Sequence, residues 1–144
     1  MGLKNVTLHP SVSKAEIARY ISVSDVALVN LKKSDTFKQV IPSKIFENAA
    51  MKRPILLGVE GESKDIIEQY NAGLCFEPEN TIDFIAKLQQ LATDTRLYKE
   101  CQIGCEKLAA DFDREVLAKR LFHILKGDAI ETTVLENVEE QVAS

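Results

Sequence analysis

Short apolar runs alternate with helical apolar patterns along the first half of the chain. The runs that are typical of strands cover residues 5–8, 25–30, 54–58 and 74–76, and they are rich in Val, Ile, Leu and Phe. Residues 25–30 are almost wholly apolar, which predicts a strand covered on both faces. Strands that alternate with helices at this spacing predict an α/β fold, with a parallel sheet of about four strands flanked by helices.

The helices between these runs are predicted from caps and from apolar spacing. Ser13 and Glu16 are spaced as a capping box, in which each side chain satisfies an orphan N–H of the first turn. The helix that follows, through about residue 22, should bury Ile17, Tyr20 and Ile21. A later helix should end at residues 71–73, because the glycine there suits the left-handed position after a helix.

From residue 80 onward the pattern is helical only. Asn80, Asp94 and Asp113 stand at three helix starts as N-cap residues. The apolar residues expected to face inward on these helices are Ile82, Ile85 and Leu88, then Leu97, Cys101, Leu108 and Phe112, then Leu117, Leu121, Ile124 and Leu125. We expect residues 1–127 to form one domain, followed by an acidic tail over residues 128–144 that is partly disordered.

Composition and charge narrow the class of protein. The 144 residues carry a net charge of −4, so no global basic field recruits nucleic acid or an anionic bilayer. The 3 cysteines lack histidines at zinc-site spacing, and they are interpreted as plain thiols in a reducing cytoplasm. No signal peptide or membrane-spanning stretch is evident. We expect a cytoplasmic protein without a metal site or membrane span.

Residues 39–50 contain the most informative chemistry. The loop should become a helix at Pro42 or Ser43, since proline has a helical φ and its missing N–H is not needed in a first turn. The apolar stripe expected on this helix is Ile45, Phe46, Ala49 and Ala50. Its first turn offers N–H groups and the positive end of the helix dipole beside Lys44, which predicts a place for a phosphate.

Several motifs occur together in a recognisable order. They are Asn-Val-Thr-Leu at residues 5–8, Asp-Val-Ala-Leu-Val at 25–29, Pro-Ser-Lys-Ile-Phe-Glu-Asn-Ala-Ala at 42–50, Arg-Pro-Ile-Leu at 53–56, Gly-Glu at 61–62, Asn-Ala-Gly at 71–73 and Glu-Pro at 77–78. This order resembles the C-terminal half of glycosyltransferase family 4. The resemblance covers about residues 3–126 and implies an incomplete, Rossmann-like C-terminal domain of the GT-B type. It points to the bacterial branch of retaining transferases that builds surface polysaccharide such as O-antigen or capsule.

The resemblance also implies roles for individual residues. Glu47 matches the acidic residue that binds the ribose hydroxyls of the donor nucleotide, and Gln39 stands where the family has another acidic residue, near the donor sugar. Ser43, Lys44 and Ile45 match the helix start that meets the diphosphate through backbone N–H groups. The turn at His9 and Pro10 matches the segment near the nucleobase. The implied ligand is a UDP-linked or GDP-linked sugar, with no further cofactor and no metal.

Alternatives remain open on the sequence. Glu47 could be a solvated residue that pairs with lysines, Lys44 an exposed cation, and Ser43 a helix cap. In the family, an acceptor domain and two βα units precede the segment that matches residue 5, so we expect either a fragment or one half of a split enzyme, inactive alone. A partner chain, a missing N-terminal acceptor domain or a homodimer would complete it and could bring it to a membrane. The alternative function is an inactive interaction subunit.

Overall fold

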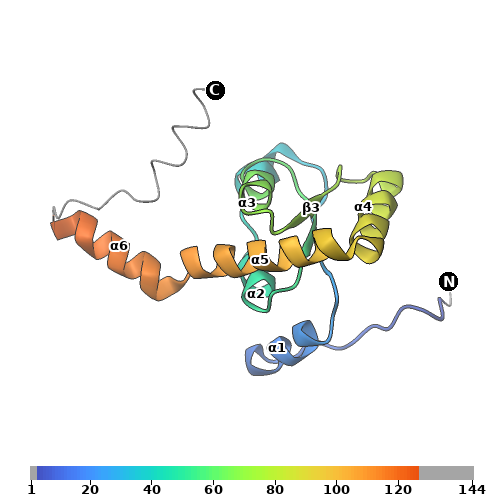
Figure 1. Ribbon diagram of the computed structural model, residues 1–144, viewed down its shortest axis with the longest axis horizontal. Helices are drawn as coiled ribbons and strands as arrows, with labels where there is room; N and C mark the ends of the chain where they lie inside the picture. Colours follow the sequence, from blue (N-terminus) through green and yellow to red (C-terminus); the bar gives the residue numbers. More distant parts are fainter. Residues whose placement is uncertain (1–2, 127–144) are drawn as a thin grey trace. The chain divides into compact units, whose positions relative to one another are not determined.

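Three parallel strands form one sheet in the computed structural model, which describes residues 3–126 (Figure 1). They are β1 (Ala27–Asn30), β2 (Ile55–Gly58) and β3 (Gly73–Cys75), in the order β1-β2-β3. The register pairs Ala27 with Ile55, and Ile55 with Gly73. The prediction of an α/β fold with a parallel sheet is confirmed.

Six α-helices and one 3₁₀ helix accompany these strands in the described part of the chain. They are α1 (Lys14–Ser22), the 3₁₀ helix η1 (Asp35–Gln39), α2 (Lys44–Ala50), α3 (Glu62–Tyr70), α4 (Thr81–Thr93), α5 (Thr95–Asp111) and α6 (Arg114–Lys126). The chain divides into two units, one up to Ala109 and the other from Ala110 onward. All three strands belong to the first unit.

Most of the predicted caps are confirmed. The Glu16 carboxylate accepts from the N–H and the hydroxyl of Ser13, at 3.2 and 2.7 Å. The Asn80 side chain accepts from the N–H of Asp83 at 3.1 Å, and Asp94 and Asp113 cap α5 and α6 in the same way. Local sequence therefore fixes where these helices begin.

The centre of the first unit is β2, whose four residues are all buried. Ile55 and Leu57 point to one face, where Ala27 and Val29 continue the apolar surface on β1. Helices α2 and α3 contact this face of the sheet, and they bury Ile45, Ala49 and Ile67. α2 connects β1 to β2 and α3 connects β2 to β3, and such a helical crossover is the usual connection between parallel strands.

The opposite face of β2 packs against the helices that follow the sheet. Leu56 forms a buried cluster with Phe76, Leu91 of α4 and Cys101 of α5. Figure 1 shows α3 and α4 on opposite sides of β3, as these contacts require. β2 and β3 therefore have helices on both faces, which is the normal condition of a parallel sheet.

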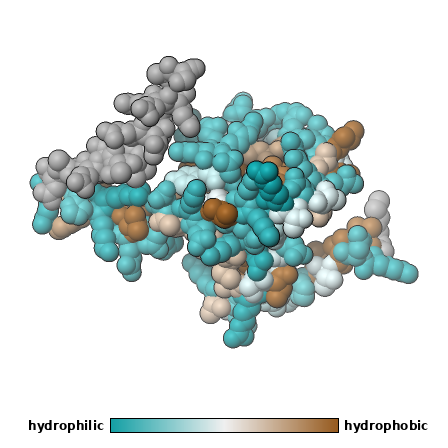
Figure 2. Space-filling model, viewed as in Figure 1, coloured by the Kyte–Doolittle hydropathy of each residue, from teal (hydrophilic) through white to brown (hydrophobic). Residues whose placement is uncertain are grey.

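The predicted strand at residues 5–8 is wrong for the described structure. These residues form no strand and pair with none of the three strands. Leu8 is 91% exposed and Val6 is also exposed, and brown apolar atoms are visible on this N-terminal part of the surface (Figure 2). A strand forms only where a neighbour satisfies its backbone groups, and in the described residues no such neighbour lies beside this segment.

Two predictions of burial beside the sheet are also wrong. β1 is covered on one face only, because Ala27 and Val29 are buried while Leu28 is 55% exposed. On α1, Ile17 and Tyr20 are exposed and Ile21 is half-buried. In both cases the apolar face exists, but none of the described elements covers it.

Helix α4 uses a different face from the one predicted. Ile82, Ile85 and Leu88 are exposed, whereas Leu91 is buried and Phe84 packs against the core cluster. Apolar residues surround much of this helix, so periodicity could not decide which side meets the sheet.

The end of α3 also differs from the prediction. Asn71, rather than Gly73, takes the left-handed conformation with φ of 52°, which asparagine tolerates better than most residues. Gly73 begins β3 instead. A Cβ there would lie 1.8 Å from the backbone oxygen of Ile55, so its glycine serves the close approach of two strands.

The described part of the second unit consists of the last residues of α5 and of helix α6. The apolar residues predicted to face inward on α6, which are Leu117, Leu121, Ile124 and Leu125, are all exposed, so that prediction is wrong for the described structure. The expected helix end at Gly127 and the acidic tail over residues 128–144 lie outside the described residues. Within residues 3–126, no helix is long and apolar enough to cross a membrane.

We predict that Ile67→Ala lowers the free energy of unfolding by about 2–5 kcal/mol, because it leaves a cavity beneath α3. Ile67 is fully buried. The matched control is Ile82→Ala, which removes the same atoms from a side chain that is 83% exposed and should change stability by less than about 0.5 kcal/mol. Chemical denaturation measures both, and equal effects would contradict the assignment of the core.

Candidate functional site

The loop that leads into α2 lies at the carboxyl edge of the sheet, the edge where all three strands end. Ser63, at the start of α3 just after β2, is fully buried and donates its hydroxyl to the backbone oxygen of Val40 at 2.9 Å. Gly61, with φ of +77°, leaves no room for a side chain, because a Cβ would lie 2.2 Å from the backbone oxygen of Lys38. These two residues fix residues 38–40 against the end of β2.

The start of α2 is built as the sequence predicts. Ser43 has helical φ and ψ, and the backbone oxygen of Pro42 accepts from the N–H of Ile45 at 3.0 Å. The Ser43 side chain makes no capping hydrogen bond, so the interpretation of this serine as a simple cap does not apply. Helix entry at Pro42 follows from its fixed φ.

The side chains of the first turn point in two directions. Ile45 is fully buried under the sheet, and its N–H is already engaged with Pro42. The Ile45 side chain therefore anchors α2, and the contact of this helix start with a diphosphate stays a prediction. Among residues 3–126, the N–H groups of Ser43 and Lys44 have no acceptor.

Glu47 and Lys44 are the exposed charges of α2. Neither forms an ion pair with another described residue, because every salt bridge within residues 3–126 involves other side chains. This argues against the alternative that Glu47 simply pairs with neighbouring lysines. A carboxylate left open to solvent can accept two hydrogen bonds from a ligand.

The other predicted site residues lie at different places in the first unit. Gln39 is exposed at the end of η1, three residues before Pro42. His9 and Pro10 are exposed in the segment before α1, where the His9 ring makes an edge contact with Tyr20 at 5.5 Å between centroids. Gln39 is thus continuous with the α2 region, whereas no described contact joins His9 or Pro10 to it.

A network of charges surrounds the carboxyl edge. The Lys33 ammonium lies 3.3 Å from Glu77 and 3.8 Å from Glu60, and Lys38 lies 2.8 Å from Asp35 and 3.8 Å from Glu60. The Lys38 contact lowers the pKa of the Asp35 carboxyl, and the Asn80 amide, followed by Lys33, lowers the pKa of Glu77. These lysines are already paired with carboxylates.

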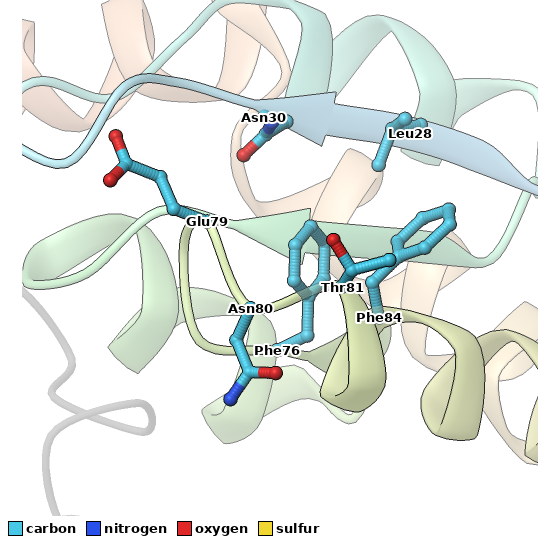
Figure 3. Close-up of a pocket in the computed structure, with 7 residues that line it drawn as sticks. All are labelled: Leu28, Asn30, Phe76, Glu79, Asn80, Thr81 and Phe84. Carbon is cyan, nitrogen blue, oxygen red and sulfur yellow. The ribbon is translucent and has the colours of Figure 1, made fainter.

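A cavity of about 340 Å³ opens beside β1 (Figure 3). Its apolar part consists of Leu28, Phe76 and Phe84, and its polar rim of Asn30, Glu79, Asn80 and Thr81. Figure 3 shows Leu28 and Asn30 reaching from β1 toward the Phe76 ring. The volume is at the lower end of the range for small-molecule sites.

Gly58 shapes the floor of this cavity. A Cβ on Gly58 would lie 2.3 Å from the Phe76 ring and 2.4 Å from the Asn30 amide oxygen, so only glycine lets both side chains close over the end of β2. On the rim, Glu79 has φ of 68° and accepts from the N–H of Lys33 at 3.2 Å. No single stretch of the sequence indicates this cavity, because the pairing of β1, β2 and β3 brings its residues together.

The three cysteines are free thiols of the first unit, where Cys101 and Cys105 are buried and Cys75 is half-buried. Burial raises the pKa of Cys75 and of Cys105 to about 12, and that of Cys101 to about 11. The Cys105 sulfur lies 3.3 and 3.1 Å from the backbone oxygens of Arg53 and Ala72, and both oxygens are within reach of its single S–H group. These thiols pack as small apolar groups, as the sequence predicts.

The comparisons with known proteins give no relative from which a role could be transferred. No protein-family model, no curated protein and no solved structure matches the chain. The functional argument therefore depends on the residues and on the geometry described above.

We predict that Gly61→Ala destabilises the fold by about 1–3 kcal/mol, because alanine at φ of +77° is strained and its Cβ overlaps Lys38. The control is Glu62→Ala at the next, exposed position, which should be near neutral. Thermal and chemical denaturation of the two variants provide the measurement. Wild-type stability of Gly61→Ala would disprove the tight contact between this turn and residues 38–40.

We also predict that the native protein reacts slowly with a thiol reagent at pH 8, whereas the urea-unfolded chain exposes all 3 cysteines. The thiolate is the reactive form, and folding raises each pKa from 9.0 toward 11 or 12. As the pH rises, the thiols of the unfolded chain ionise before those of the folded protein. The free energy of unfolding should therefore fall as the pH rises above 9. Rapid labelling of the folded protein would contradict this burial.

Proposed function

We propose that this chain is the donor-binding half of a retaining glycosyltransferase for bacterial surface polysaccharide, such as O-antigen or capsule. The observation that carries the proposal is Glu47, an exposed carboxylate one turn into α2 that forms no ion pair within residues 3–126. It accepts both hydroxyl protons of the ribose of a UDP-linked or GDP-linked sugar, since its two oxygens suit a cis-diol. The residues around it carry the resemblance to glycosyltransferase family 4.

The location of α2 supports the same proposal. In open parallel α/β sheets, ligands bind outside the carboxyl ends of the strands, and residues 38–40 are fixed at that edge by Gly61 and Ser63. The diphosphate lies beside Ser43 and Lys44, where two N–H groups and one unpaired ammonium are available. Ile45 supports this turn from below through its buried side chain.

The proposed role is binding rather than reaction. Gln39 carries no charge, so it positions a sugar hydroxyl by hydrogen bonding but does not stabilise a developing positive charge as a carboxylate would. The acceptor, and the groups that complete the reaction, come from a second domain or a second chain. The isolated chain is therefore expected to bind donor nucleotide without turnover.

An interaction subunit without donor binding is the second candidate function. Two observations favour it, which are Gln39 at the family's acidic position and the pairing of Lys33 and Lys38 with carboxylates. Both reduce the positive potential available to a diphosphate at the carboxyl edge. In this reading, the sheet and its helices serve only to complete a partner protein.

We predict that UDP, GDP or one of their sugar conjugates raises the melting temperature of the full chain, and that Glu47→Ala weakens this ligand about 10- to 100-fold. The estimate follows from about 1.5–3 kcal/mol for hydrogen bonds to a charged group. Thermal shift identifies the nucleotide, and calorimetry gives the dissociation constants. The ligand-free variant should melt near the wild type, because Glu47 is exposed.

The matched control is Glu115→Ala on α6, which removes an equally exposed carboxylate from the second unit. It should leave nucleotide affinity unchanged. If no nucleotide stabilises the wild type, or if Glu47→Ala binds as tightly as the wild type, the donor-binding proposal is wrong and the interaction subunit is favoured.

A further inference from the structure

The outer edge of β1 has backbone groups without a strand partner in the described structure. Ala27 and Leu31 donate their N–H groups toward β2, to the oxygens of Pro54 and Gly58 at 3.0 and 3.3 Å. Because alternate residues of a parallel strand turn to opposite sides, Leu28 and Asn30 direct their N–H and C=O groups away from the sheet. β1 is also the first strand in the order β1-β2-β3.

This edge has no chemical protection against pairing. Its sequence, Ala-Leu-Val-Asn, contains no charged residue and no proline. Charged residues and prolines are the usual features that prevent an edge strand from pairing with another chain. Leu28 is 55% exposed and forms one wall of the cavity with Phe76 and Phe84 (Figure 3). An incoming strand would thus gain both backbone hydrogen bonds and apolar contact.

The same chain contains a segment suited to this edge. Residues 5–8 read Asn-Val-Thr-Leu, which has the strand preference and the length of β1. Val6 and Leu8 share one side of an extended segment, and both are exposed. Neither forms part of a strand in the described structure, so the segment and the edge are unsatisfied at the same time.

We propose that residues 5–8 of one copy pair with β1 of a second copy, and the reverse, in an exchanged homodimer. The order of strand segment, α1 and β1 along the chain is that of a βαβ unit, which makes the new pairing parallel. Reciprocal exchange covers the outer edge of β1 in both copies and closes the assembly with two-fold symmetry. Leu8 or Val6 of the second copy enters the cavity beside Leu28.

This inference is independent of the proposed nucleotide site, since it uses no residue of α2. Sedimentation equilibrium of the full chain should give twice the chain mass of 16.1 kDa. Leu28→Lys places a charge on the edge and should return the protein to the mass of one chain. The control Ile103→Lys changes an α5 residue of the same 55% exposure and should leave the dimer intact.

Cross-linking keeps the test valid even if Leu28→Lys folds poorly. Leu8→Cys and Leu28→Cys are made in separate chains of distinguishable mass, mixed by unfolding and refolding, and treated with a short bifunctional thiol reagent. A linked heterodimer is expected, and the wild type, whose own thiols are half-buried or buried, should give none. A monomeric wild type would overturn the proposal. A third variant carries both Leu8→Cys and Leu28→Cys in one chain. Linkage within this variant, with none between the separate chains, would also overturn the proposal, because residues 5–8 would then pair with their own β1.

Discussion

The complete burial of β2 is the constraint on which the rest of the first unit depends. Ile55, Leu56 and Leu57 are covered on both faces, so α2 and α3 must lie on one side and α4 and α5 on the other. Parallel pairing to β1 and β3 then brings all three strand ends to one edge. The turn after β2 holds residues 38–40 at that edge, and the start of α2 follows directly. The position of Glu47 is therefore a consequence of how one strand is buried.

Features that depend on neighbours in sequence were predictable. The Ser13 and Glu16 pair, the Asn80 cap and helix entry at Pro42 each involve atoms within one turn, and the structure has all three. Burial of an apolar face was not predictable in the same way. Leu28, Ile17 and Ile82 belong to clear apolar patterns, yet all are exposed, because periodicity describes a surface and not what lies opposite it.

In the candidate site, too, local features were predictable from the sequence and long-range contacts were not. The sequence identified Ser43, Lys44 and Glu47 because they lie within five positions of one another at the start of one short helix, and the structure leaves all three exposed. It could not identify Ser63 as the residue that holds Val40, since the contact spans 23 positions. The resemblance implies a backbone contact of Ile45 with the diphosphate, and the structure adds that the Ile45 side chain is buried in the core. Residues that are close in sequence could therefore be predicted together, whereas contacts between distant residues could not, because these depend on the order of the strands.

The charges at the carboxyl edge bear on how a nucleotide would be held. Lys33 and Lys38 are paired with nearby carboxylates, so among the described residues of α2 a diphosphate would meet Lys44 and two backbone N–H groups. Exposed charges are also screened by solvent and salt, which limits what a single lysine contributes. Binding by this chain alone would consequently depend more on the ribose contact of Glu47 than on the phosphates. A second domain or chain that brings unpaired cations to this carboxyl edge would supply most of the remaining affinity. The outer edge of β1, which has no strand partner among the described residues, leaves room for such a second chain.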